Sequence, residues 1–462
     1  MDGNVAHCID GEEDEGEIPE CNGGIQVIVN AATACHAEGQ SKSAILEDVL
    51  ATGQGDRNNL NLTGWKRTAA VNDRSAQSPL TKEIWEKHID KDGRVTNEDK
   101  IRERIFKGGI NPIDRKDVWK FLFGMYLFNS TFRERLALDE ERAVRYFALR
   151  ARWQFELRKY NVYHQDDVNN INSDEPVFMV VQKQVKLYAC RQPFDENLTL
   201  QAIRTIDKDV PRTDRVIDFY QGEQGDKRLE SLRHILITFA AFHPGVTYAQ
   251  GMNDVLSRFL VVLESEVDAF WCFNYFIERV ENDFCESGML LKIASVQRLL
   301  MVLDSKLFEY LESLNASDLM ICHRWLLLTF KREFAFDDSL KIFEIIYSGH
   351  LEPHSYEGAM AIEQQRILEI EKGGGCVHGL EVDVNSEFTF DIFVSVAVLM
   401  IFRANIMKAA DATEVFSCLN NLTTGMDLNT VIEVAECLFF IYCRTTVRDS
   451  FEIIQSGKEA EE

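Results

Sequence analysis

Apolar residues recur every three or four positions through most of this chain, and this spacing constrains the fold more than any other feature. Residues spaced in this way lie on one face of an α-helix, where they can be buried together. Alternating apolar and polar residues, the pattern of a half-buried strand, are scarce. The clearest helical runs are Leu232, Ile235, Leu236, Phe239 and Phe242; Leu299, Leu303, Leu307 and Leu311; and Val267, Phe270, Trp271, Ile277 and Val280. The sequence therefore predicts an all-α, multi-helix fold.

Proline is rare, with 8 in 462 residues, which agrees with long uninterrupted helices. Inside a helix, proline removes a backbone donor and clashes with the preceding turn. The most apolar run is IFVSVAVLMIF at residues 392–402. It is about half as long as the roughly 20 residues that span a bilayer. We therefore expect a buried helix there and no transmembrane segment.

The balance of charge narrows the choice of partners. Lysine and arginine total 50 against 75 acidic residues, a formal net charge of −25. This balance argues against nucleic acid as a partner and makes any membrane contact at most peripheral.

The 11 cysteines form no CxxC pair and no zinc-type group with histidine, which indicates reduced cysteines in a cytoplasmic protein. The first residues have no pattern of a secretory signal, so no export is expected.

The N-terminal residues 1–78 differ from the rest of the chain in composition. Residues 1–64 contain twelve acidic and two basic side chains among scattered Gly, Asn and Ala. Such a segment buries little apolar surface, so we predict a flexible acidic N-terminal region. Within it, SAILEDVLATG (43–53) favours one short helix and IQVIV (25–29) one short strand.

Residues 79–106 predict a helical lead-in segment, with two helices joined by the turn DKDG. The same turn raises a calcium alternative. An EF-hand loop would need an acidic residue where His88 stands, two positions before Asp90. A plain turn is therefore favoured.

We predict the main domain over residues 107–445, and its helical pattern lapses twice. Residues 161–200 are polar and predict a surface loop. Residues 351–386 contain EKGGGCVHGLEVDVNSE and predict an exposed insertion loop between helices. Residues 446–462 predict a polar C-terminal tail.

The sequence lacks the motifs of an enzyme with its own nucleotide or metal. It contains no GxxxxGK[ST], HExxH or GxSxG motif and no GxGxxG after a strand. Cys322 and His323 are adjacent, so on a helix their side chains point about 100° apart. A core cysteine beside a partly exposed histidine is favoured over a catalytic pair.

Three short motifs, in one order, indicate a function. RKDVW (115–119) follows KGGI, IDKDVPR (206–212) comes next, and YAQGMND (248–254) is third. As RxxxW, IxxDxxR and YxQ, they resemble the signature motifs of the TBC domain, the catalytic module of Rab GTPase-activating proteins (Rab-GAPs). The segments VDAFWCF (267–273) and RWLLLTFKREF (324–334) resemble the same family.

This resemblance implies an activity in trans. In the family, an arginine finger from the second motif and a glutamine finger from the third enter the GTP site of a Rab, a small GTPase. By motif position these are Arg212 and Gln250. The implied partner is a Rab in its GTP-bound form, which holds GTP and magnesium itself, so this chain is expected to need no cofactor and no metal. The implied process is vesicle trafficking, with recruitment to membranes by the partner.

The two side-chain types suit that chemistry. Arginine stays protonated and offers a planar fork of donors that can bridge phosphate oxygens. Glutamine can accept a proton of the attacking water and donate to an oxygen without adding charge. An arginine finger contributes roughly 10³- to 10⁵-fold in rate, so one residue can decide the function.

The residues around the fingers receive supporting roles. We expect Ile206 to support the second motif, Asp209 to pair with Arg212, and Pro211 to push Val210 toward an extended conformation. Tyr248 is expected to pack beneath the turn of Gln250, and Gly251 to let the backbone come close to a partner.

Other motif residues are predicted to be structural. Arg115 and Trp119 are four residues apart on one helical face, where they can stack. Asp254 is expected to pair locally. Two positions depart from the family pattern: Arg258 stands where many relatives have a small residue or proline, and FEII (343–346) replaces a common Trp-Asp pair.

A binding function remains the alternative. The chain could be a TBC-fold Rab effector or scaffold without turnover. The presence of both fingers favours GTPase activation, because a protein that only binds has no chemical need for them.

Overall fold

The computed structural model describes residues 77–160, 176–243, 245–374, 385–420 and 426–459. The described residues all belong to one compact unit of the chain. The predicted flexible acidic region, with its short helix and short strand, lies outside the described residues except for positions 77 and 78.

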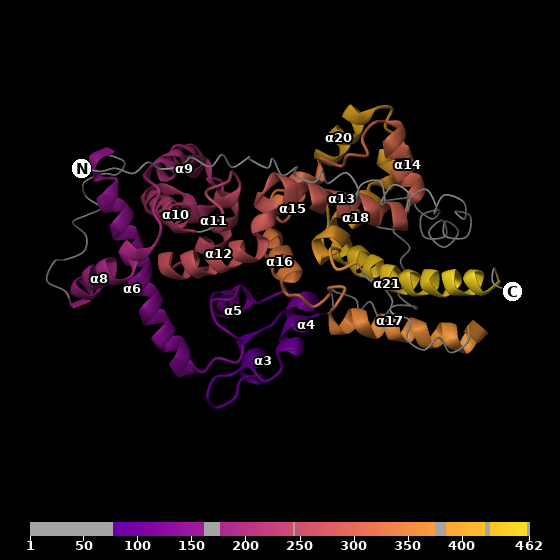
Figure 1. Ribbon diagram of the computed structural model, residues 1–462, viewed down its shortest axis with the longest axis horizontal. Helices are drawn as coiled ribbons and strands as arrows, with labels where there is room; N and C mark the ends of the chain where they lie inside the picture. The colour runs from indigo at the N-terminus through magenta and orange to yellow at the C-terminus, as the bar shows by residue number, and fades with distance from the viewer. Residues whose placement is uncertain (1–76, 161–175, 244, 375–384, 421–425, 460–462) are drawn as a thin grey trace, which may run out of the picture. The chain divides into compact units, whose positions relative to one another are not determined.

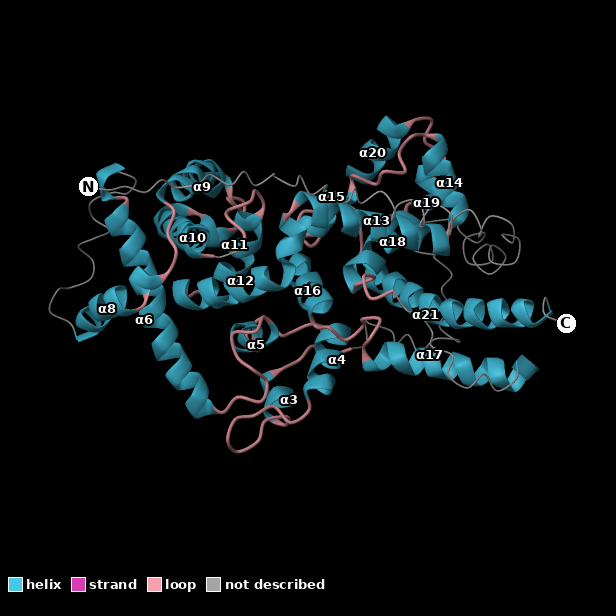
Figure 2. Cartoon of the chain, viewed as in Figure 1, coloured by secondary structure: helices cyan, strands magenta, loops and turns pink. Residues whose placement is uncertain are grey.

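The described residues confirm the all-α prediction (Figure 2). They contain helices and two isolated β-bridges but no strand. The α-helices are α3 (Lys82–Glu86), α4 (Glu98–Gly108), α5 (Arg115–Leu122), α6 (Phe132–Glu156), α8 (Pro176–Leu187), α9 (Glu196–Asp209), α10 (Gly222–Phe242), α11 (Met252–Leu263), α12 (Glu266–Val280), α13 (Glu286–Leu303), α14 (Ser305–Ser313), α15 (Cys322–Leu327), α16 (Phe336–Tyr347), α17 (Tyr356–Glu369), α18 (Phe390–Ile401), α19 (Arg403–Ile406), α20 (Ala412–Asn420) and α21 (Leu428–Glu459). Short 3₁₀ turns include η5 (Val210–Arg212), η6 (Asp218–Tyr220) and η7 (Glu281–Phe284).

The lead-in segment contains the two predicted helices, α3 and α4, and the turn between them. Asp90 closes this turn by accepting hydrogen bonds from the backbone N–H groups of Asp92 and Arg94, at 2.9 and 2.8 Å. Gly93 takes the left-handed conformation there, with φ 95°. Leu80 is fully buried and pairs with Ile110 through backbone hydrogen bonds, which ties the segment to the main domain.

An aromatic cluster joins α5, α11, α12 and α16. Phe123 lies 4.8 Å from both Phe259 and Phe343, measured between ring centroids. Trp119 and Phe276 complete the cluster. Aromatic side chains bury large areas and pack in preferred geometries. The cluster therefore fixes α11, the helix that begins directly after the YxQ motif.

The C-terminal helices pack around α18. Residues 390–400 of α18 are all buried, which confirms the buried helix predicted at 392–402. Helix α18 contacts α13 and α21, and α17 and α21 lie side by side (Figure 1). No described helix has the length and hydropathy needed to cross a membrane.

The prediction of a surface loop over 161–200 is wrong in its second half. Helix α8 begins at Pro176 and packs against α6, with Val181 buried. Proline suits the first turn of a helix because the N–H that it lacks has no partner there. The polar run before Pro176 led to the prediction of a loop over the whole stretch. Residues 161–175 lie outside the described part of the chain.

The insertion loop predicted at 351–386 is wrong over residues 356–369, which form α17. The buried face of α17 consists of Gly358, Ala361 and Gln365, so it has no large apolar residues to reveal a helical period. A Cβ on Gly358 would lie 2.9 Å from the carbonyl oxygen of Glu352 and 3.3 Å from the Phe439 ring. Close packing of small residues replaces the usual apolar stripe at this position.

The predicted polar tail is also largely helical, because α21 continues to Glu459. Val447 and Phe451, four residues apart, are buried on one face. These two apolar residues at helical spacing are the signal of a helix in the first part of this stretch.

Candidate functional site

The segment with Arg212 leaves the end of a well-anchored helix. Helix α9 is capped by Asp195, which accepts a hydrogen bond from the Leu198 N–H, and Ile206 is fully buried near its C-terminal end. The chain then forms η5, which ends at Arg212. The side chain of Arg212 is 64% exposed.

The extended conformation predicted for Val210 is wrong. Val210 is helical, with φ −56° and ψ −48°, and its N–H donates to the Ile206 carbonyl group. The Val210 carbonyl group in turn accepts a hydrogen bond from Thr213, 3.1 Å long. These bonds, with burial of the valine, outweigh the preference that proline imposes on the residue before it.

A buried carboxylate joins the second and third motifs. Asp209 is 3% exposed, and its Oδ1 accepts a hydrogen bond from Arg212 Nη2 at 2.5 Å. Its other oxygen, Oδ2, accepts from the Tyr248 hydroxyl at 2.7 Å. Burial and the neighbouring carboxylate raise the pKa of Tyr248 well above its ordinary value. The hydroxyl therefore stays protonated and is the donor of this hydrogen bond. Asp209 and Arg212 are therefore paired as expected, and Tyr248 anchors the pair.

The turn that carries Gln250 is held by Asn253. Asn253 Oδ1 accepts from the Gly251 N–H at 3.3 Å, and Nδ2 donates to the Thr213 hydroxyl at 2.9 Å. Thr213 donates in turn to the Asp209 carbonyl group, at 2.9 Å. Gln250 itself is exposed. Through Asn253, the turn is thus linked to Thr213, the residue that follows Arg212.

Gly251 meets two constraints at the start of α11. Its φ of 106° is one that other residues rarely adopt. A Cβ there would lie 3.2 Å from Leu328 and 3.4 Å from Leu327. This glycine therefore allows a close approach to the protein's own leucines; a close approach to a partner stays a prediction.

Arg115 and Trp119 belong to a separate, buried site. Arg115 Nε and Trp119 Nε1 both donate to Glu344 Oε1, at 2.7 and 2.9 Å, and the Ile110 N–H donates to Oε2 at 3.1 Å. Burial raises the pKa of Glu344, although Arg115 favours the ionised form. The two motif residues thus converge on one carboxylate, where the sequence analysis expected them to stack on each other.

Asp254 pairs locally, as expected. Its Oδ1 accepts from Lys331 at 3.1 Å and its Oδ2 from Arg332 at 2.8 Å. Burial alone would raise the pKa of Asp254, but these two cations outweigh it and hold the pKa below its ordinary value. The Arg332 side chain is 59% exposed, so it adds a second accessible cation to the one at Arg212.

The two departures from the family pattern touch each other. Arg258 is fully buried, and its guanidinium carbon lies 4.4 Å from the centre of the Phe343 ring. Its Nη2 donates to the Leu328 carbonyl group, while Nε and Nη1 have no acceptor among the described residues. Burial lowers the pKa of Arg258 to about 10, so it stays protonated at neutral pH.

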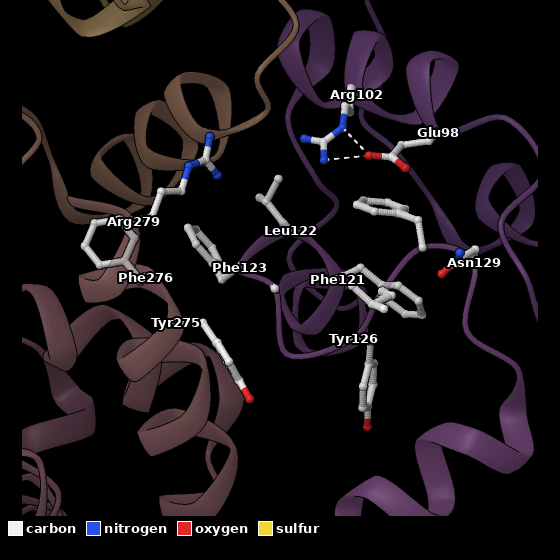
Figure 3. Close-up of a pocket in the computed structure, with 13 residues that line it drawn as sticks. Glu98, Arg102, Phe121, Leu122, Phe123, Tyr126, Asn129, Tyr275, Phe276 and Arg279 are labelled. Carbon is white, nitrogen blue, oxygen red and sulfur yellow. Dashed lines mark hydrogen bonds and ion pairs between the residues drawn. The ribbon is translucent and has the colours of Figure 1, made fainter. Parts of the chain in front are cut away.

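A cavity of about 520 Å³ lies apart from these motifs (Figure 3). Aromatic side chains dominate its lining, including Phe121, Phe123 and Tyr126, and Arg102 is paired with Glu98 at its edge. No residue of 206–215 or 248–254 lines it. Arg212 and Gln250 are instead on exposed turns. No group of His, Cys, Asp and Glu suited to hold a metal ion occurs in the described parts of the chain.

The structure therefore gathers these site residues on α9, η5, the turn before α11 and the first turn of α11: Ile206, Asp209, Arg212, Tyr248, Gln250, Gly251 and Asp254. Arg115 and Trp119 lie elsewhere, on α5. The sequence analysis did not single out Thr213, Asn253 or Lys331. Their signal was present, because Asn253 stands inside YAQGMND and Lys331 inside RWLLLTFKREF. Neither segment says which of its residues bond to the loop of Arg212.

Comparisons with known proteins find relatives over the region that carries the three motifs. Residues 114–366 match the family model of the Rab-GTPase-TBC domain. The chain is 34% identical over 274 residues to TBC1 domain family member 17 of Mus musculus, which covers 59% of this chain and 37% of that protein. It is 27% identical over 390 residues to the GTPase-activating protein GYP7 of Yarrowia lipolytica, covering 83% of this chain and 46% of that protein. Each match therefore spans less than half of the relative's length.

A solved structure shows the same fold. The crystal structure of the Ypt/Rab-GAP domain of Gyp1p matches with a TM-score of 0.53, over 80% of this chain and 99% of that chain. Sequence identity is 17%, so this likeness concerns the fold alone.

Proposed function

Because this chain belongs to the Rab-GTPase-TBC domain family, we propose that it accelerates GTP hydrolysis by a Rab GTPase. The partner is the GTP-bound form, and Arg212 and Gln250 act in trans in its nucleotide site. GTP and magnesium belong to the partner. The chain would in this way end the active state of a Rab and so regulate vesicle trafficking on membranes to which that partner recruits it.

One observation carries this proposal: an exposed arginine is held by a buried carboxylate that also anchors the glutamine-bearing turn. Arg212 is 64% exposed, and Asp209 bonds both Arg212 and Tyr248. By contrast, Arg115 is buried together with its carboxylate partner, Glu344, and cannot reach another protein. The guanidinium group of Arg212 is oriented and still accessible. A hydrogen-bond donor to the phosphates of GTP in a partner protein needs both properties.

Each finger has a defined task in the proposed reaction. Negative charge spreads over the transferring phosphoryl group in the transition state, and the guanidinium group of Arg212 offsets it. Gln250 orients the attacking water through its amide oxygen and nitrogen. Because Asp209 limits the rotamers of Arg212 before the partner arrives, less conformational entropy is lost on binding.

The test is phosphate release from a panel of GTP-loaded Rab GTPases, with the wild type, Arg212→Ala and Gln250→Ala. Binding of each variant to the same GTP-loaded Rab is measured in parallel. Loss of rate with binding preserved is the expected result. Rates that are unchanged in both variants would contradict GTPase activation and support the alternative, a Rab effector or scaffold.

A further inference from the structure

The loop that carries Arg212 is anchored on both sides. On the side of α9, Asp209 and Val210 fix it through the bonds described above. On the other side stands Asp214, in the left-handed conformation with φ 46°. Its Oδ2 accepts a hydrogen bond from the Ser257 hydroxyl at 2.5 Å and a second from Lys331 Nζ. The backbone of Arg212 therefore lies between two carboxylates that are each tied to other elements.

Lys331 connects this loop to the turn of Gln250. Its side chain is 4% exposed, and its ammonium group also donates to the backbone carbonyl and the Oδ1 of Asp254, at 2.9 and 3.1 Å. An ammonium group has three hydrogens, and here it meets three acceptors. Asp254 lies in the first turn of α11, directly after the Gln250–Gly251 turn. One side chain thus bridges the segments that carry both fingers.

We propose that Lys331 is a positioning residue for GTP hydrolysis: it holds the loop of Arg212 against the turn of Gln250, so that both side chains reach the partner in one geometry. This inference rests on the proposed function. Burying the charge of a lysine costs desolvation free energy, and an apolar residue of similar size often stabilises a fold as well. The three hydrogen bonds of Lys331 go to Asp214, in the loop of Arg212, and to Asp254, in the helix that follows Gln250. The need to join these two segments explains why a charged side chain stands at position 331.

The experiment compares Lys331→Met with the wild type in the full 462-residue chain. It measures single-turnover phosphate release from the GTP-loaded Rab that the wild type stimulates most, with the chain in excess. A misplaced catalytic group can cost about 100-fold in rate, so we expect the maximal rate to fall about 10- to 100-fold. The half-saturating concentration should change by less than about threefold, because contacts made only in the transition state are affected.

Two further variants separate positioning from loss of folded protein. Lys292→Met is the matched control, because Lys292 also bridges two carboxylates, Asp283 and Asp391, with 16% of its side chain exposed. It should lower the melting temperature and leave the maximal rate per folded molecule unchanged. Asp214→Asn keeps a residue that tolerates the left-handed backbone and removes only the charge. Asp214→Asn should lower the maximal rate, as Lys331→Met does. It replaces Lys331→Met in the experiment if that variant does not fold.

The outcomes are distinguishable. If Arg212→Ala leaves the rate unchanged, the proposed function itself fails. If Arg212→Ala abolishes stimulation while Lys331→Met and Asp214→Asn keep the wild-type rate, only the positioning role is overturned. The positioning role is also overturned if Lys292→Met lowers the maximal rate per folded molecule as much as Lys331→Met does. Added to a variant that carries both Arg212→Ala and Gln250→Ala, Lys331→Met should reduce the residual rate no further, since it acts through those two side chains.

Discussion

Arg115 and Arg212 are each paired with a buried carboxylate, and they differ in how much of the guanidinium group meets solvent. Arg115 is bonded to Glu344, and their side chains are 9% and 0% exposed. Arg212 is bonded to Asp209, and the exposed fractions are 64% and 4%. The same ion pair can therefore join helices inside a domain or hold an arginine ready at its surface. Exposure of the cation decides between the two uses.

The largest expected effect comes from Arg212→Ala. An arginine finger contributes roughly 10³- to 10⁵-fold in rate, or about 4–7 kcal/mol, so stimulated hydrolysis should fall by that factor. Stability should fall by only about 1 kcal/mol or less, because water can replace the exposed guanidinium group next to Asp209. Phosphate release and thermal unfolding measure the two effects. A large loss of stability with an unchanged rate would remove the distinction between the two arginines.

The second effect is the reverse case, Arg115→Met. Removing one partner of a buried pair typically destabilises by about 3–5 kcal/mol, because the other charge is left buried. The Trp119 and Ile110 donors remain, so we expect a value near the lower end of that range. Chemical denaturation measures it, and the rate per folded molecule should equal that of the wild type. A rate defect at full occupancy of the folded state would show that the buried pair also acts on the site.

A third prediction compares the two carboxylates. Asp209→Asn should reduce the maximal stimulated rate about 10- to 100-fold, because Arg212 loses the charge that orients it. Glu344→Gln is the matched control, since it removes one carboxylate charge from the buried pair and should affect only stability. If Asp209→Asn stimulated GTP hydrolysis by the Rab at the wild-type rate, Asp209 would have no orienting role.

The smallest effect concerns pH. The folded-state pKa of Asp254 is lowered, so its stabilisation is present above its unfolded pKa of about 3.9 and is lost as pH falls through the folded value. The pKa of Glu344 is raised, so its ionisation weakens the fold as pH rises above about 4.3. Unfolding of Asp254→Asn and Glu344→Gln from pH 3 to 7 should show opposite trends relative to the wild type. Parallel trends would contradict the assignment.

The sequence was sufficient where a local pattern had one physical reading. The burial of α18 follows directly from its continuous apolar run, and the helices of the lead-in segment follow from the turn residues between them. Helix α17 was missed because it buries Gly358, Ala361 and Gln365, and helix α8 because a polar run precedes Pro176.

The candidate site was predictable only in part, for a similar reason. Arg212 and Gln250 were identified by their motifs and the resemblance, and Asp209 by its spacing from Arg212. Glu344 and Lys331 are more than 75 residues from their partners Arg115 and Asp254, and no local pattern records a bond across such a distance. The conformation of Val210 depends on burial and on two backbone bonds, so the identity of the next residue did not decide it.

The contact between Arg258 and Phe343 has a consequence for protein engineering. The two residues lie on α11 and α16, and each departs from the pattern common in the family. A chimera that received α11 of a relative would lose the cation that donates to the Leu328 carbonyl group and leave a gap against Phe343. A chimera that received only α16 would press a different ring against a buried charge. Any exchange of helices with a relative should therefore replace α11 and α16 together.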